Sequence, residues 1–286
     1  MSRTRERIRD SALQYQKGLG QNFIYDTDLL EELAELSGVT EEDDVLEIGA
    51  GSGTLTRVLC ARARRVLSME LDGRLLPLIR AGTEGFGNLE LVQGDVMAAD
   101  LKAVTSSLRP PFSVVANLPY YITTPVLLRF LTEGLPLKRL AVMVQKEAAD
   151  RILSGPGEEG WGMLPLQRAL RCRCEQMRPV PRECFTPVPG VDSAFITLTF
   201  LDRPMVTPLS MEDFQRVAAA GFALRRKTMA NALMAAFRLK KEEAVEWMRR
   251  AGLDEKARGE KLTLEELKRL SDLWTEGVIH DGSGKV

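Results

Sequence analysis

The most informative part of this 286-residue chain for its fold class is Asp44-Val45-Leu46-Glu47-Ile48-Gly49-Ala50-Gly51-Ser52-Gly53. Its first half is a short, largely apolar run, which is typical of a buried strand, and three glycines at alternate positions follow it directly. A helix is predicted to begin near Thr54. Glycine permits a positive φ and a close approach of ligand to backbone, and a helix N-terminus favours an anionic group. The stretch therefore predicts a strand, a ligand-binding turn and a helix.

Apolar runs separated by helical patterns continue from this stretch along the first half of the chain. Strands are predicted over 65–69 and 89–93, followed by one that ends at Asn117 and one over 140–144. This β-α-β alternation predicts a doubly wound, largely parallel α/β sheet, and ligands bind such sheets beyond the carboxyl ends of the strands. Besides the glycine-rich turn, three polar residues stand at those ends: Glu70, Asp95 and Asn117.

The strand that ends at Asn117 continues into Leu118-Pro119-Tyr120-Tyr121. A buried strand would hold Asn117 rigidly, and Pro119 restricts the backbone that carries the Leu118 carbonyl. The amide oxygen and this carbonyl are two acceptors for the N–H groups of an exocyclic amine, and Tyr120 offers a ring for stacking on a planar base. Asn and Pro are also common in turns, so the motif by itself is also typical of a strand followed by a turn.

The glycine-rich turn leaves two cofactors open, NAD and S-adenosylmethionine. Glu70, 17 residues after Gly53, would bind ribose hydroxyls in either case. Asp95 at the next strand end can accept from an adenine amine, which places the adenine across the sheet as in methyltransferases. A dehydrogenase needs no amine-binding motif at Asn117 and usually needs a proton donor such as histidine. The one histidine, His280, lies in a polar tail, so the sequence favours S-adenosylmethionine.

Composition narrows the class of protein further. Hydrophobic residues make up 44% and charged residues 28%, as in an ordinary globular enzyme, and no apolar run approaches the roughly 20 residues that span a membrane. The cysteines lack Cys-x-x-Cys spacing and the chain has one histidine, so we expect no metal site. We expect the cysteines to be reduced thiols, as in a cytoplasmic protein. Because no apolar run could span a membrane, we expect no membrane partner. The formal net charge is −1, so a nucleic-acid partner would require clustered positive charge.

Changes of pattern predict three segments. Residues 1–20 read as a basic, mobile tail, and residues 21–203 as the Rossmann-like domain. Beyond a proline-punctuated link the pattern becomes helical only, with capping residues at Ser210 and Thr263, so residues 204–286 are predicted to form a small all-helical domain.

Six motifs are spread over nearly the whole chain: Leu19-Gly20-Gln21-Asn22-Phe23, Glu47-Ile48-Gly49-Ala50-Gly51, Asn117-Leu118-Pro119-Tyr120, Gln145-Lys146-Glu147, Phe185-Thr186-Pro187 with Val191-Asp192-Ser193, and Arg225-Arg226-Lys227-Thr228. Together they resemble the ribosomal RNA adenine N6,N6-dimethyltransferases, most closely the bacterial enzymes of the small subunit. The resemblance implies a Rossmann-like S-adenosylmethionine-dependent methyltransferase fold with a small C-terminal helical domain. It also implies a cofactor site made of these residues: Asn22, the backbone of Ile24, Gly49, Gly51, Glu70, Asp95 and Asn117.

The resemblance assigns the target base to the end of the Asn117 strand. Asn117 and the Leu118 carbonyl would bind the N6 amine, Pro119 would fix the turn, and Tyr120 would stack on the adenine. Phe185 would pack on the other face of the base, although a phenylalanine beside a proline turn is also typical of a core residue.

The reaction implied is dimethylation of two adjacent adenosines in the loop of the 3′-terminal hairpin of 16S rRNA, by a monomer acting on the small subunit or its precursor. Arg225, Arg226 and Lys227, expected at the start of a helix, would contact RNA, although such a cluster alone is often a solvated face. The related 23S rRNA enzymes of macrolide resistance usually have Ile where this chain has Leu118, and they are typically basic. A non-catalytic assembly factor is the other alternative, against which the intact Asn117 motif argues. Tyr121 departs from many relatives, which carry Asn, and is expected to affect the edge of the pocket.

Overall fold

The computed structural model describes residues 22–277, and these form two compact units. In described residues, the units are 22–149 with 173–200, and 150–172 with 201–277. The start of the helical segment at 201 lies close to the division at 204 expected from the sequence. Residues 150–172 also belong to the helical unit, which the sequence pattern did not indicate. The basic tail predicted over 1–20 lies outside the described residues.

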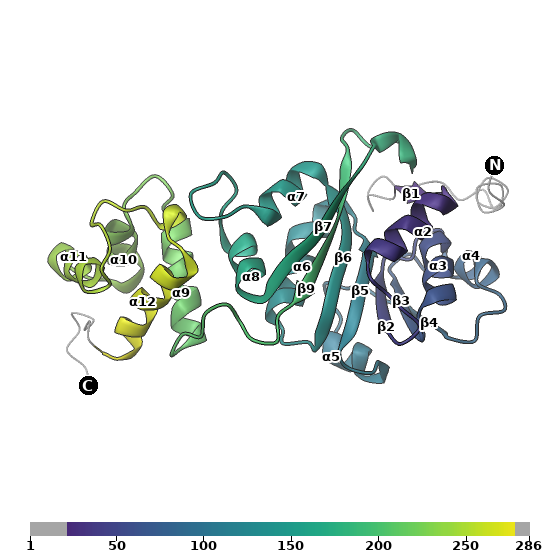
Figure 1. The fold of residues 1–286 in the computed structure, drawn as a ribbon, viewed down its shortest axis with the longest axis horizontal. Helices are drawn as coiled ribbons and strands as arrows, with labels where there is room; N and C mark the ends of the chain where they lie inside the picture. Colours follow the sequence, from purple (N-terminus) through teal and green to yellow (C-terminus); the bar gives the residue numbers. More distant parts are fainter. Residues whose placement is uncertain (1–21, 278–286) are drawn as a thin grey trace. The chain divides into compact units, whose positions relative to one another are not determined.

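The first unit is built around a seven-stranded sheet in the order β4-β3-β2-β5-β6-β9-β7 (Figure 1). Strands β2 to β6 run parallel, and β9 pairs with β6 in the antiparallel direction. This confirms the predicted doubly wound, largely parallel sheet. The strands are β2 Asp44–Ile48, β3 Arg65–Glu70, β4 Leu89–Gln93, β5 Phe112–Asn117, β6 Leu137–Gln145, β7 Cys172–Val180 and β9 Ser193–Phe200.

The central position of β2 follows from its composition. All five of its residues are buried, including Val45 and Leu46, whose side chains point to opposite faces of the sheet. A strand covered on both faces belongs in the middle of a parallel sheet. The order of connection reverses between β2 and β5, and ligands bind open α/β sheets at such a switch point.

Helices cover the sheet and connect its strands. Helix α2 begins after Asp26, whose carboxylate accepts hydrogen bonds from the Asp28 and Leu29 amides. Apolar residues of α2 and α3 pack with residues of the central strands in one core, on one face of the sheet (Figure 1). The helices of this part are α2 Thr27–Leu36, α3 Thr54–Arg62, α4 Leu76–Gly82, α5 Leu101–Val104 and α6 Thr123–Thr132, with short 3₁₀ turns η2 Thr105–Ser107, η3 Tyr120–Ile122 and η4 Arg182–Cys184. Helix α7 (Lys146–Leu153) begins in this unit, and its residues from 150 onward belong to the helical unit.

A second, two-stranded sheet pairs segments that are distant in the sequence. Strand β1 (Phe23–Ile24) runs antiparallel to β8 (Phe185–Thr186), with Ile24 opposite Phe185. The pairing fixes the segment that contains Asn22 against the unit. Strands this short carry too little periodicity to be predicted from sequence.

The helical unit has its own core, centred on Trp247, whose indole Nε1 donates to the Leu270 carbonyl at 2.9 Å. Ser210 and Thr263 cap α9 and α12 as predicted, by accepting from backbone amides three residues later. Its elements are α8 Met163–Arg171, α9 Met211–Ala223, α10 Met229–Phe237, α11 Lys241–Arg250, η5 Gly259–Lys261 and α12 Leu264–Thr275.

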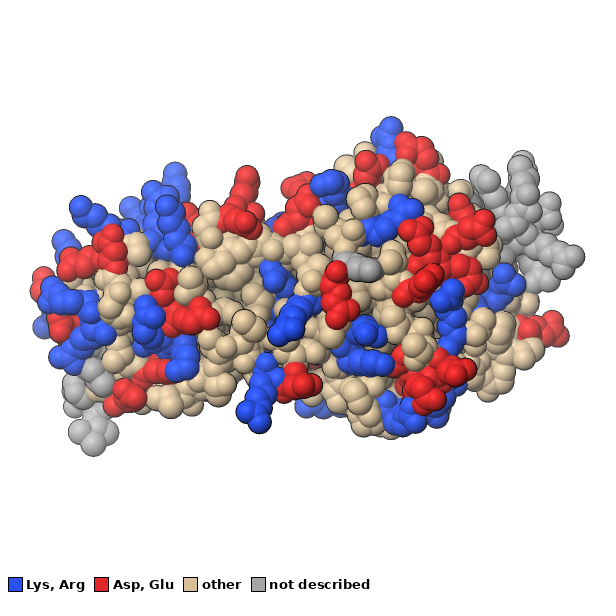
Figure 2. All heavy atoms as spheres, viewed as in Figure 1, with Lys and Arg blue, Asp and Glu red and all other residues tan. Residues whose placement is uncertain are grey.

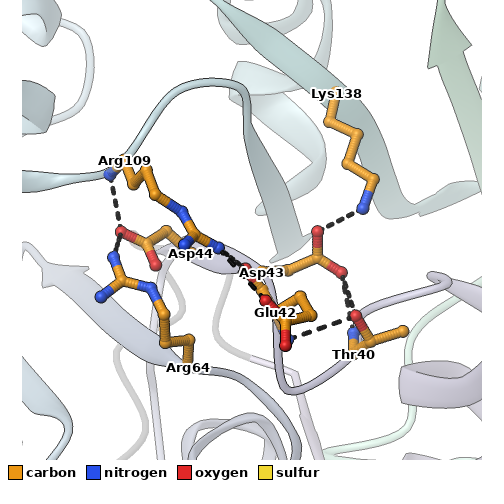
Figure 3. A network of polar contacts seen from close by, with 7 residues as sticks. All are labelled: Thr40, Glu42, Asp43, Asp44, Arg64, Arg109 and Lys138. Atoms are coloured by element: carbon orange, nitrogen blue, oxygen red, sulfur yellow. Dashed lines mark hydrogen bonds and ion pairs between the residues drawn. The ribbon is translucent and has the colours of Figure 1, made fainter.

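The amino end of β2 is held by two buried aspartates (Figure 3). Asp44 Oδ2 accepts from Arg64 Nη2 at 2.5 Å and from the Arg109 amide at 2.6 Å. Asp43 accepts from the Thr40 amide at 2.9 Å and from the Lys138 ammonium. These bonds fix β2 at the end of the strand opposite to its glycine-rich turn.

Candidate functional site

A cavity of about 360 Å³ opens at the carboxyl ends of the parallel strands of the first unit. Its volume falls within the range of small-molecule binding sites. The wall includes most of the residues predicted from the sequence: Asn22, Ile24, Gly49, Gly51, Glu70, Asp95, Asn117, Leu118, Pro119 and Tyr120. The structure therefore brings together strand ends that are spread over about a hundred residues of sequence.

The glycine-rich turn forms one side of this cavity. Gly49, Gly51 and Gly53 have φ of +75°, +56° and +75°, a region that side chains other than glycine rarely adopt. A Cβ atom on Gly51 would lie 2.6 Å from the Phe23 ring, so the space is closed to any larger residue. On Gly49 it would lie 3.7 Å from the Asn117 carbonyl, which shows how near the two strand ends are.

Glu70 both supports this turn and faces the cavity. Its Oε2 accepts from the Gly51 amide at 2.8 Å, and its Oε1 accepts from the Asp72 amide at 2.8 Å. Burial raises the pKa of Glu70, and these backbone hydrogen bonds oppose the rise. Asp95 is exposed at the next strand end, where its Oδ1 accepts from the Met97 amide at 2.8 Å. Both carboxylates are therefore oriented by backbone N–H groups and have lone pairs left for a ligand.

Asn117, the last residue of β5, is oriented by the first described residue of the chain. Its Nδ2 donates to the Asn22 carbonyl at 3.0 Å. This bond uses the donor side of the amide and leaves Oδ1 as an acceptor without a partner among the residues described. The Leu118 amide donates to Met143 on β6 at 3.3 Å, which fixes the backbone after the strand. Two oxygen acceptors, Asn117 Oδ1 and the Leu118 carbonyl, therefore follow each other at a rigid point of the wall.

Tyr120 is held in place by a loop that the sequence did not connect with the site. Its hydroxyl lies 2.8 Å from Ser193 Oγ, at the start of β9. Burial raises the pKa of Tyr120, against the hydrogen bond with Ser193, which lowers it. The phenol is therefore neutral at physiological pH, and its ring is fixed at both ends. Ser193 belongs to the motif Val191-Asp192-Ser193, so holding Tyr120 is one role of that motif.

Phe185 does not occupy the place expected for it. Its side chain is 1% exposed and belongs to the core of the sheet unit, opposite Ile24 of β1, and it does not line the cavity. A ring buried to this extent presents no face to a base. Phe185 is therefore a core residue and not a base-stacking residue, because the pairing of β1 with β8 holds its side chain inward.

Arg225, Arg226 and Lys227 are exposed, as expected, but they do not start a helix. They lie in the turn between α9 and α10, and Thr228 caps α10 after them by accepting from the Asn231 amide. Arg225 Nε lies 3.3 Å from Glu260, whereas Arg226 and Lys227 have no acidic partner among the described residues. All three belong to the helical unit.

Other features bear on the chemistry that the site permits. All four cysteines lie within the described residues and are free thiols. Between residues 22 and 277, no helix is long and apolar enough to cross a membrane. The same part of the chain contains no group of three or more His, Cys, Asp or Glu side chains that could hold a metal ion. Cavity residues that the sequence did not indicate include the following: Phe23, Leu71, Met97 and Phe195.

Comparison with known proteins agrees with this geometry. A sequence profile described as "Ribosomal RNA adenine dimethylase" matches residues 12–276. Ribosomal RNA small subunit methyltransferase A of Geobacillus thermodenitrificans is 39% identical over 276 residues, which covers 94% of each chain. The same enzyme of Enterococcus faecalis is 38% identical over 278 residues, covering 95% of this chain and 94% of the relative.

Two solved structures share the fold. A dimethyladenosine transferase from Plasmodium falciparum superposes with a TM-score of 0.73 at 23% identity, over 91% of this chain and 99% of the other. The 23S rRNA methyltransferase ErmE superposes with a TM-score of 0.66 at 27% identity, over 88% of this chain and 98% of the other. The Rossmann-like methyltransferase fold with its helical C-terminal part is thereby confirmed. The chain therefore belongs to the ribosomal RNA adenine dimethylase family, a family of methyltransferases.

Proposed function

We propose that this enzyme uses S-adenosylmethionine to dimethylate N6 of two adjacent adenosines in the loop of the 3′-terminal hairpin of 16S rRNA. The observation that carries the proposal is the orientation of Asn117. Its Nδ2 is bonded to the Asn22 carbonyl, so Oδ1 is the atom that the side chain offers to a ligand. The relatives named for the small ribosomal subunit support the choice of RNA.

The cavity fits the cofactor through the chemistry of its donors and acceptors. The positive-φ glycines open the backbone to the methionine part, with Asn22 and Ile24 at its border. Glu70, which is already oriented by two amides, would accept from the ribose hydroxyls, and Asp95 from the adenine amine. When bound, S-adenosylmethionine supplies an electrophilic methyl group on its sulfonium.

Asn117 and the backbone at Leu118 orient the nucleophile. The lone pair of an adenine amine is delocalised into the ring, which makes the amine a poor nucleophile. Two acceptors, Asn117 Oδ1 and the Leu118 carbonyl, would bind its two hydrogens and favour a pyramidal nitrogen. Pro119 restricts the backbone at this point. Correct orientation of the reacting groups can contribute about 7–11 kcal/mol to a rate enhancement, so no strong base is required.

Tyr120 would hold the target base by stacking. The hydrogen bond to Ser193 fixes the ring, and stacking of a base on an aromatic side chain is worth about 1–3 kcal/mol. The base must leave its own stack to reach the cavity, and a loop adenosine does so at the least cost. Each transfer forms the N–C bond as the S–C bond of the sulfonium breaks, and one proton then leaves the nitrogen to water. After the first transfer the amine keeps one hydrogen, so the monomethyl product can bind again and accept the second methyl group.

The RNA would also contact the helical unit. On the face seen in Figure 2, Lys and Arg are interspersed with Asp and Glu over both units, in accord with the net charge of −1. Contact with phosphates therefore depends on local clusters, and Arg225, Arg226 and Lys227 are the cluster proposed here. The enzyme is proposed to act as a monomer in the cytoplasm, where small subunits mature.

The test is methylation of purified small ribosomal subunits that lack the modification. The protein and S-adenosylmethionine are added, the RNA is digested, and nucleosides and mapped fragments are measured by mass spectrometry. The expected product is N6,N6-dimethyladenosine at two adjacent positions in the 3′-terminal hairpin. Absence of this product with active cofactor binding would contradict the proposal and favour a non-catalytic assembly role.

A second candidate substrate is 23S rRNA, because the structure of ErmE superposes over 88% of this chain. Large subunits and free 23S rRNA are therefore included in the same assay. Dimethyladenosine that forms only in 23S rRNA would favour this alternative over the small subunit.

A further inference from the structure

Tyr121 is an aromatic side chain at the rim of the cavity that the proposed chemistry does not use. It lines the cavity together with Asn117, yet its side chain is 58% exposed. Among the described residues it is the one aromatic in the group of large apolar side chains that are strongly exposed. An aromatic ring beside a base-binding cavity, open to solvent, is available for stacking.

The local backbone separates the directions of the two tyrosines. Tyr120 and Tyr121 are consecutive residues of the 3₁₀ turn η3, in which successive side chains are rotated by about 120°. Tyr120 points to Ser193. The two rings therefore cannot stack on the same base, and Tyr121 is left to contact a different nucleotide.

The position of Tyr121 is also fixed before any ligand arrives. Pro119 precedes the turn, the Ile122 amide donates to the Pro119 carbonyl at 3.1 Å, and α6 begins at Thr123. A ring mounted on such a turn loses little backbone freedom on binding, so most of its stacking energy remains available.

The loop that ends at Ser193, beside the Tyr120 hydroxyl, carries an exposed apolar side chain, Val191. Val191 is 47% exposed and stands two residues before Ser193, so its Cα lies within about 7 Å of that of Ser193. The loop is anchored at Asp192, whose carbonyl accepts from the Lys146 amide and whose Oδ1 accepts from the Arg182 amide, both at 3.0 Å.

We infer that Tyr121 positions the substrate by stacking on the base of the nucleotide next to the target adenosine. The inference rests on the proposed function. In RNA with two adjacent targets, this neighbour is the second adenosine when the first occupies the cavity. Tyr121 then acts on substrate placement, and it does not touch the reacting amine.

The test compares Tyr121→Ala with Tyr121→Phe on unmethylated small subunits. Loss of one stacked base raises KM for the subunits in Tyr121→Ala about 5- to 150-fold, with kcat changed less than about twofold. Tyr121→Phe keeps the ring and restores KM to the wild-type value. The Kd for S-adenosylmethionine, measured by calorimetry, should be unchanged in both variants. A substitution that disturbed the fold of the cavity would raise this Kd.

Leu209→Ala is the matched control, because it removes an exposed apolar side chain, 61% exposed, from the helical unit. It is expected to leave KM unchanged. An unchanged KM in Tyr121→Ala, or a raised KM in Tyr121→Phe, would overturn the stacking role. Wild-type protein that forms no dimethyladenosine would instead contradict the proposed function itself, so the two failures are distinguishable.

Discussion

Glu47 in the middle of β2 makes the stability of the sheet depend on pH. Its side chain is fully buried, Ser68 Oγ donates to Oε2 at 2.6 Å, and Oε1 has no hydrogen-bond partner within residues 22–277. Burial raises the pKa of Glu47 from 4.5 to about 7. The hydroxyls of Ser68 and Thr56 oppose the rise, and the charge of Glu70 adds to it. The folded state therefore holds this carboxyl in its neutral form at mildly acidic pH.

The direction of the effect follows from linkage. The folded pKa lies above the unfolded one, so the stabilisation is fully present below pH 4.5 and is lost as the pH rises through about 7. At about 1.4 kcal/mol per pKa unit, this interval corresponds to about 3 kcal/mol. Glu47→Gln keeps the size of the side chain and is neutral at every pH. We therefore expect the variant to gain about 2–3 kcal/mol relative to the wild type between pH 5 and pH 8.

Hydrogen exchange measured by mass spectrometry reports this change where it occurs. The measured quantity is the exchange rate of an amide in the wild type divided by its rate in Glu47→Gln. For amides of β2, β3 and β5, this ratio should be about 30- to 150-fold larger at pH 8 than at pH 5. Amides of α9 to α12 serve as the internal control. Glu42→Gln is the matched variant, because its side chain is 80% exposed, and it should show no such shift. An equal ratio at pH 5 and pH 8 would show that Glu47 ionises in the folded protein without cost, which would contradict this prediction.

Two further predictions concern the glycine-rich turn and the basic turn. Gly51→Ala places a Cβ 2.6 Å from the Phe23 ring at a φ of +56°, so S-adenosylmethionine affinity should fall at least tenfold in calorimetry. The control is Gly87→Ala, which should bind the cofactor normally because a Cβ at Gly87 meets no atom within 4 Å. Unaltered affinity of Gly51→Ala would show that the turn can rearrange. Neutralising Arg226 and Lys227 together should reduce the slope of log K against log salt for small subunits by about 1–2, at roughly 0.9 per phosphate contact. The control neutralises Lys240 and Lys241, which lie beyond the other end of α10, and should leave the slope unchanged. An equal reduction of the slope in both double variants would show that Arg226 and Lys227 make no specific contact with RNA.

The sheet and most of the cavity could be predicted because they depend on local patterns. Strand β2 reads as a buried apolar run, and the glycines after it are required by their positive φ. Glu70, Asp95 and Asn117 meet because parallel strands end at one edge of a sheet. Each of these features depends on a pattern of a few consecutive residues.

The parts that could not be predicted depend on contacts between distant segments. Phe185 is buried because a two-residue strand pairs with β1, and no sequence pattern shows such a pairing. The bond between Tyr120 and Ser193 joins positions 73 residues apart. Residues 150–172 contribute Trp161 and other apolar side chains to the core of the helical unit, and their amphipathic pattern does not say which core they join.

The binding of the target amine by Asn117 is tested by single-turnover methylation of small subunits with the variant Asn117→Ala. Cofactor affinity is measured by calorimetry on the same variant, and Asn117→Asp is added because it keeps an acceptor while losing the Nδ2 donor to Asn22. We expect Asn117→Ala to lower the methylation rate by about 10²-fold or more, with cofactor affinity changed only a few-fold, because the contact matters most in the transition state. A methylation rate close to that of the wild type under saturating cofactor would contradict it.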